Sequence, residues 1–170
     1  QMLCPALAVR ARALVAAGAR DDAAQAAEEL LALWTEKLDL FLTSAWVVDL
    51  AWALDDLGRG AELSEIAASV RARTAWLEAA DACASGGFDV AAGILAEIGS
   101  RPDEAMARLR SARVFSASGH GAVARQNLER ALAASMLGVL LVIGAVSHYF
   151  HIPIVHWLVF SLCVAFAAGA

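Results

Sequence analysis

Charge is missing from the end of this chain. All thirteen basic and eighteen acidic residues lie between Arg10 and Arg130, and residues 131–170 contain no Asp, Glu, Lys or Arg. Over all 170 residues the charged fraction is 18%, below the value of roughly a quarter that soluble domains show. The apolar fraction of 60% excludes an intrinsically disordered chain, which combines low hydrophobicity with high net charge.

Cysteine and lysine are also scarce. The three cysteines, Cys4, Cys83 and Cys163, lie far apart, which excludes a disulfide scaffold and predicts reduced packing residues. Lys37 is the single lysine among thirteen basic residues, and this bias, together with the high alanine content, suggests a GC-rich bacterium. The net charge of −5 argues against a dedicated nucleic-acid binder.

Catalytic motifs are absent as well. The sequence has no GxxxxGK[ST] phosphate loop, no GxGxxG and no GxSxG. Acid pairs such as Asp55–Asp56 and Asp103–Glu104 are predicted to cap helices or face solvent, because adjacent helical residues point apart. Acid–base catalysis needs two carboxylates in one pocket. We therefore expect no enzyme activity, no cofactor and no small-molecule substrate.

What is present up to Arg130 is a succession of helices rich in alanine, leucine and arginine, which are strong helix formers. Glycines near 18, 58, 86 and 119 are predicted to end helices. The pattern predicts helices over 3–17, 21–37, 39–57, 60–71, 74–85, 88–98, 102–117, 121–147 and 154–169.

A repeat of about 34 residues is suggested by the last two glycine turns. Val90 aligns with Val123, Ala91 with Ala124, and Leu95 with Leu128. This period and turn chemistry are in the style of tetratricopeptide (TPR) helix pairs. We therefore predict a TPR-like α-solenoid over residues 1–130.

The most apolar segment before Arg130 is DLFLTSAWVVDLAWALDDLG, residues 39–58. One interpretation is a central helix that neighbours bury on both sides. The other is an exposed groove for a partner helix, since repeat proteins bind through such surfaces. The candidate partner-binding residues are Phe41, Trp46, Trp52 and Trp76.

Residues 131–170 are predicted to form a hydrophobic helical hairpin that spans a membrane. The spans cover about 131–150 and 154–170, with a break in SHYFHIP near Pro153. A single span with an interfacial segment, and a buried core or docking surface of a soluble protein, are the alternatives. Because Arg113, Arg125 and Arg130 precede the first span, the positive-inside rule places residues 1–130 in the cytoplasm.

The start of the chain, QMLCPALAVRARALVAAGAR, lacks a basic n-region, so we expect no cleavable signal peptide there. His148, His151 and His156 cluster around the break between the spans. Imidazoles at a membrane helix end can ligate haem, a pigment or a metal. A polar turn at the lipid surface is the simpler interpretation of the same histidines.

The stretches RTAWLEAA, LAEIGSRPDEA and LERAL carry a family likeness. Residues 30–132, approximately, resemble the TPR-like C-terminal region of large bacterial ATPase and adenylate/guanylate-cyclase-type signalling regulators. The resemblance implies a protein-interaction and regulatory module, with the catalytic modules upstream. It transfers no catalytic residue, and it ends where ASMLGVLLVIGAV begins.

Together these observations predict an all-α protein with two parts, a TPR-like repeat over 1–130 and a transmembrane hairpin over 131–170. We expect a non-enzymatic membrane-anchored scaffold or accessory subunit in a bacterial inner membrane, with protein partners that include other membrane subunits and with the lipid bilayer. One alternative is the regulatory tail of a nucleotide-dependent signalling enzyme. A second is a haem- or pigment-carrying membrane subunit.

Overall fold

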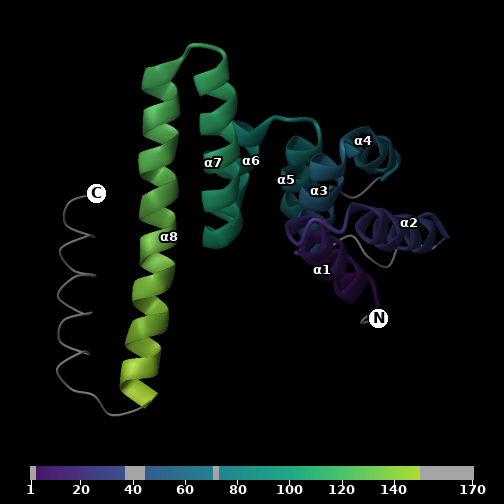
Figure 1. Cartoon of the computed structure of the whole chain (residues 1–170), viewed down its shortest axis with the longest axis horizontal. Helices are drawn as coiled ribbons and strands as arrows, with labels where there is room; N and C mark the ends of the chain where they lie inside the picture. Colours follow the sequence, from purple (N-terminus) through teal and green to yellow (C-terminus); the bar gives the residue numbers. More distant parts are fainter. Residues whose placement is uncertain (1–2, 37–44, 71–72, 150–170) are drawn as a thin grey trace. The chain divides into compact units, whose positions relative to one another are not determined.

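The computed structural model describes residues 3–36, 45–70 and 73–149, and for residues 35–36 and 136–149 it describes the backbone alone. This part of the chain is all-helical and contains no strand (Figure 1). Its eight helices are α1 (Leu3–Ala16), α2 (Arg20–Glu36), α3 (Trp46–Leu57), α4 (Gly60–Ser69), α5 (Ala75–Ala84), α6 (Phe88–Glu97), α7 (Arg101–Ala117) and α8 (Gly121–Tyr149).

The predicted all-α class is confirmed for these residues, and most predicted helix boundaries agree with the structure within two residues. The main difference is α3, which begins at Trp46 in the described part of the chain, whereas the predicted helix begins at 39. Residues 37–44 lie outside the described residues, as does the predicted helix over 154–169.

Glycine ends five helices in the same way. Gly18, Gly58, Gly86, Gly99 and Gly119 all have φ between 77° and 81°, a left-handed conformation in which a Cβ is unfavourable. At each turn the N–H groups of the glycine and of the next residue donate back to carbonyls of the preceding helix, as when His120 donates to Phe115 at 2.8 Å. These are Schellman motifs. Four of the five glycines are predicted above, and Gly99 is not.

The chain divides into two compact units, residues 1–103 and residues 104–170. In the first unit, α1 contacts α3, and α3 contacts α5. Helix α2 packs mainly on α1, and both α4 and α6 pack on α5. The arrangement is a series of helical hairpins, as in a repeat protein.

The core of the first unit is built from alanine, leucine, valine and tryptophan. Helix α3 is buried over most of its length because α1 and α5 both contact it. Trp34 meets Trp46 edge-on with ring centroids 5.6 Å apart, and Trp52 stacks on Phe88 at 6.2 Å. Such aromatic pairs stabilise beyond the apolar area that they bury.

The second unit contains most of α7 and all of α8, joined by the turn at Ser118–His120. Helix α8 passes Arg130 without a break, so the boundary predicted at 130 falls inside a continuous helix. Ala124, Asn127, Ala131 and Ala134 are buried along one side of it.

No helix in the part of the chain with described side chains is long and apolar enough to cross a membrane. The predicted spans, 131–150 and 154–170, lie almost entirely outside that part.

Candidate functional site

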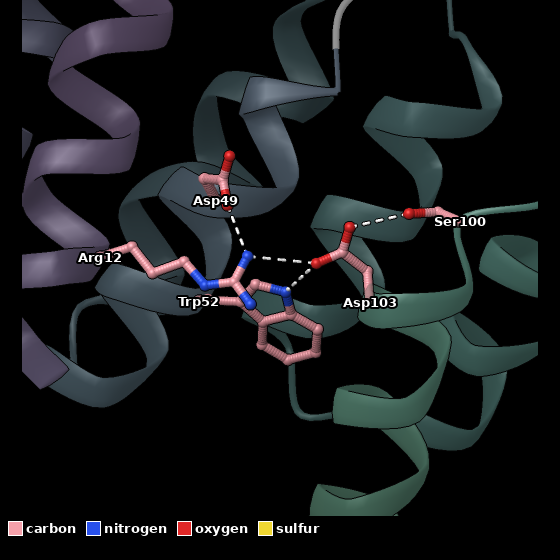
Figure 2. Close-up of polar contacts among 5 residues, drawn as sticks. All are labelled: Arg12, Asp49, Trp52, Ser100 and Asp103. Atoms are coloured by element: carbon pink, nitrogen blue, oxygen red, sulfur yellow. Dashed lines mark hydrogen bonds and ion pairs between the residues drawn. The ribbon is translucent and has the colours of Figure 1, made fainter. Parts of the chain in front are cut away.

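A polar cluster joins α1, α3 and the start of α7 (Figure 2). Arg12 on α1 donates from Nη1 to Asp49 on α3 at 2.5 Å and to Asp103 in the first turn of α7 at 3.2 Å. The side chains of Arg12, Asp49 and Asp103 are 33%, 23% and 18% exposed. The ion pairs are therefore partly shielded from water, which strengthens them relative to pairs on an open surface.

Two further hydrogen bonds complete the cluster. The indole N–H of Trp52 donates to Oδ1 of Asp103 at 3.2 Å, and the hydroxyl of Ser100 donates to Oδ2 of the same carboxylate at 2.8 Å. Figure 2 shows Asp103 at the centre of these contacts. We call Arg12, Asp49, Trp52, Ser100 and Asp103 the Arg12 cluster.

The sequence places Asp103 where a helix start requires it. Ser100 precedes α7, Pro102 lies in its first turn, and an acidic residue there is favourable against the helix dipole. Adjacent Glu104 points elsewhere and accepts from Arg108 at 2.8 Å one turn later. The two carboxylates point apart, as the sequence predicts, and each is held by a different arginine. Glu104 does not face solvent, because it is buried against Arg108.

The geometry of the Arg12 cluster suits holding helices together. An acid–base pair needs two carboxylates in different environments, whereas Asp49 and Asp103 share one nitrogen of one guanidinium. Arginine stays protonated and can only donate. Among the described residues, no group of three or more His, Cys, Asp or Glu side chains is placed to hold a metal ion.

A second arginine links α2 to α4. Arg59 precedes α4 and donates to Glu62 at 2.6 Å and to Glu28 on α2 at 2.9 Å. The hydrogen bond from Arg59 holds the pKa of Glu62 below its ordinary value of 4.5, and the hydrogen bond to Glu62 raises the pKa of Arg59. The two neighbouring hairpins are thus bridged by one charged side chain.

Two of the four predicted partner-binding aromatic residues lie in the core. Trp46 and Trp52 are 4% and 1% exposed and belong to the core, which corresponds to the buried alternative for this helix. Trp76 on α5 is partly exposed, and Phe41 lies outside the described residues. Trp46 and Trp52 are buried because α3 contacts helices on both sides.

The predicted histidine ligands lie at or beyond the end of the described chain. The backbone at His148 is part of α8, whereas His151 and His156 lie outside the described residues. His120, in the turn between α7 and α8, is exposed and meets Phe115 edge-on at 6.1 Å.

Sequence reasoning missed the Arg12 cluster. Arg12 and Asp49 are separated by 37 residues and Arg12 and Asp103 by 91, and no local pattern pairs them. One signal was available in the sequence. Asp49 is the only charged residue between Asp39 and Asp55, and a charge in such an apolar stretch requires a partner when it is partly buried.

Exposed apolar side chains mark two other places. In the first unit, Leu3 and Val9 on α1 are 52% and 55% exposed. In the second unit, Val114 on α7 and Leu128 and Leu132 on α8 are 50%, 44% and 57% exposed.

Of the pairs aligned in the predicted repeat, Ala91 and Ala124 are both buried, but Leu95 is buried and Leu128 is exposed.

Comparison with protein-family models, with curated proteins and with solved structures finds no match.

Proposed function

We propose that this chain is a non-enzymatic, membrane-anchored protein-interaction module that acts as a scaffold or accessory subunit of a larger membrane complex. Its helical hairpins would be a TPR-like repeat on the cytoplasmic side of a bacterial inner membrane. Protein partners would bind the repeat, and residues 131–170 would form the hydrophobic hairpin in the bilayer.

The observation that carries this proposal is the continuity of α8. The helix begins at Gly121 among charged residues, passes Arg130 and continues to Tyr149 without a break. From Ala131 onward its sequence is free of charge, and an uncharged run of this length favours a bilayer over water. A repeat that continues directly into such a segment would be held close to the membrane surface.

The repeat arrangement of the first unit supports a role in binding. Successive hairpins present long surfaces, and polar side chains such as those of the Arg12 cluster are engaged in structural contacts between helices. The carboxylates of that cluster are committed to an arginine and to two other donors. The arrangement therefore favours a binding protein over an enzyme.

Carbonate extraction of the full chain tests the proposal. The wild-type protein is expected to stay with the membrane pellet after an alkaline carbonate wash. The variant Leu137→Arg/Leu141→Arg is expected to be extracted, because each arginine in the middle of a span costs about 3 kcal/mol of insertion free energy. The matched control is Leu3→Arg/Val9→Arg, at exposed positions of α1. Extraction of the wild-type chain would reject the anchor.

One observation favours the alternative, a regulatory tail of a nucleotide-dependent signalling enzyme. The outer face of α1 carries exposed Leu3 and Val9, whereas α3 is covered on both sides by α1 and α5. A further hairpin of a repeat array would cover a face of this kind. A wild-type chain that is fully extracted by carbonate, and soluble without detergent, would support this alternative.

A further inference from the structure

The two compact units differ sharply in charge. Residues 1–103 hold sixteen acidic and eight basic residues, whereas residues 104–170 hold two glutamates and five arginines. One of those glutamates, Glu104, is buried against Arg108. The second unit is therefore basic within a chain whose net charge is −5. A basic surface attracts anionic partners, and the acidic first unit does not share this property.

The basic residues of the second unit accompany exposed leucines. Arg125, Leu128 and Leu132 are spaced three and four residues apart, so they lie along one side of α8. Arg125 is exposed, and the two leucines are 44% and 57% exposed. Arg113 and Arg130 are exposed as well. Arginines interspersed with exposed aliphatic side chains are typical of helices at a lipid headgroup layer.

The position of these residues along α8 fits that layer. The charge-free run begins at Ala131, directly after Arg130. At 1.5 Å per residue, Arg125 lies about 9 Å before Ala131 along the helix axis. The headgroup region adds about 5–8 Å on each side of the hydrocarbon core. A helix that enters the core near Ala131 would hold Arg130 at the inner edge of the headgroup layer and Arg125 at its outer edge.

We propose that the α7–α8 hairpin binds anionic phospholipid headgroups through Arg113, Arg125 and Arg130, with Leu128 and Leu132 inserted between the lipids. This inference rests on the proposed membrane anchor and adds the surface and the lipid class. Guanidinium groups bind phosphate bidentately. The acidic side chains that outnumber the basic ones in residues 1–103 make that unit a poor competitor for the same lipids.

Lipid retention by the full chain tests the inference. The protein is reconstituted into vesicles of phosphatidylcholine with one part in four phosphatidylglycerol, then extracted in mild detergent, and the retained lipid is measured by mass spectrometry. The wild-type chain is expected to retain phosphatidylglycerol in several-fold excess over its bilayer fraction. The variant Arg125→Gln/Arg130→Gln is expected to lose this excess, since each arginine near an anionic surface contributes about fivefold to lipid binding.

The matched control is Arg10→Gln/Arg20→Gln, which removes two exposed arginines from α1 and α2 and is expected to keep the excess. Carbonate pelleting of the same vesicles reports the anchor separately. If all three proteins stay in the pellet and retain equal amounts of phosphatidylglycerol, the headgroup site is rejected and the anchor stands. If the wild-type chain leaves the pellet, both proposals fail.

A second copy of the chain is the competing occupant, because its acidic first unit complements the basic surface. Sedimentation of the full chain in detergent without phosphatidylglycerol distinguishes this case. A salt-sensitive dimer that Arg125→Gln/Arg130→Gln abolishes, with no effect of the substitutions on lipid retention, would overturn the headgroup site in favour of a protein contact.

Discussion

At the scale of single residues, Arg12 links α1 to α3 and to the first turn of α7. It contacts carboxylates on two other helices, and those carboxylates are 23% and 18% exposed. Removal of the cation would leave Asp49 and Asp103 close together without a counter-charge. Loss of one partner of a partly buried pair is more costly than loss of the whole interaction.

Arg12→Met is therefore expected to lower the free energy of unfolding by about 2 kcal/mol, less than the cost for a fully buried pair because water still reaches the site. Urea unfolding followed by tryptophan fluorescence measures this change. Arg73→Met is the matched control, since the Arg73–Asp81 pair is more exposed, 39% at the arginine, and contributes less than about 1 kcal/mol. Equal losses in both variants would reject the central role of Arg12.

A second residue-scale prediction concerns Gly60 at the start of α4. A Cβ at this position would collide with the backbone carbonyl of Ala84 at the end of α5. Gly60→Ala is expected to destabilise the protein by about 2 kcal/mol, because a backbone atom cannot move aside cheaply. Gly93→Ala, in α6 with open space around it, is expected to stabilise by about 0.5–1 kcal/mol. Thermal unfolding compares the two, and a stabilising Gly60→Ala would contradict the close approach of α4 and α5.

At the scale of elements, the hairpins are held together by alanine-rich packing and by single charged bridges. Arg59 joins α2 to α4 through Glu28 and Glu62. The pKa of Glu62 is lowered in the folded state, so its ionised form favours folding. This stabilisation is present above its ordinary pKa of about 4.5 and is lost as the pH falls through the lower folded value.

Glu62→Gln is accordingly expected to reduce stability at pH 7 by less than about 1 kcal/mol, because the side chain is 42% exposed. The difference from the wild-type protein should vanish in acid, where Glu62 is protonated in both states. Urea midpoints measured at intervals between neutral and acidic pH give this comparison. A deficit that is independent of pH would assign the effect to packing.

Element boundaries are where local sequence was most informative. Gly18, Gly58, Gly86 and Gly119 mark helix ends because a left-handed residue with no Cβ is a local requirement. Thr74 caps α5 by accepting from the N–H of Leu77, and this also depends on neighbours in sequence. Gly99 was not predicted, because the predicted spacing assigned one glycine to each helical hairpin. The four predicted glycines end odd-numbered helices, whereas Gly99 ends α6.

At the scale of the whole molecule, the division after Asp103 predicts that a destabilising substitution in one unit speeds local unfolding in that unit and not in the other. Residues that pack within one compact unit open together, and their exchange protection follows that unit's stability.

Hydrogen exchange on the full chain tests this division. Gly60→Ala is expected to speed amide exchange throughout α1–α6 and to leave α8 unchanged. Gly119→Ala, at the turn between α7 and α8 where φ is 81°, is expected to do the reverse. Equal acceleration in both regions by either variant would contradict two independent units.

The helical class, the helix limits and the abrupt end of charge at Arg130 are local properties, because backbone propensity, glycine turns and composition act over a few residues. Two other features depend instead on which helices contact one another. These are the burial of Trp46 and Trp52 and the ion pairs of Arg12 with Asp49 and Asp103. Those contacts join residues tens of positions apart, and many pairings satisfy the same hydrophobic pattern. Packing in three dimensions selects among them through shape and through the cost of leaving a half-buried charge without a partner.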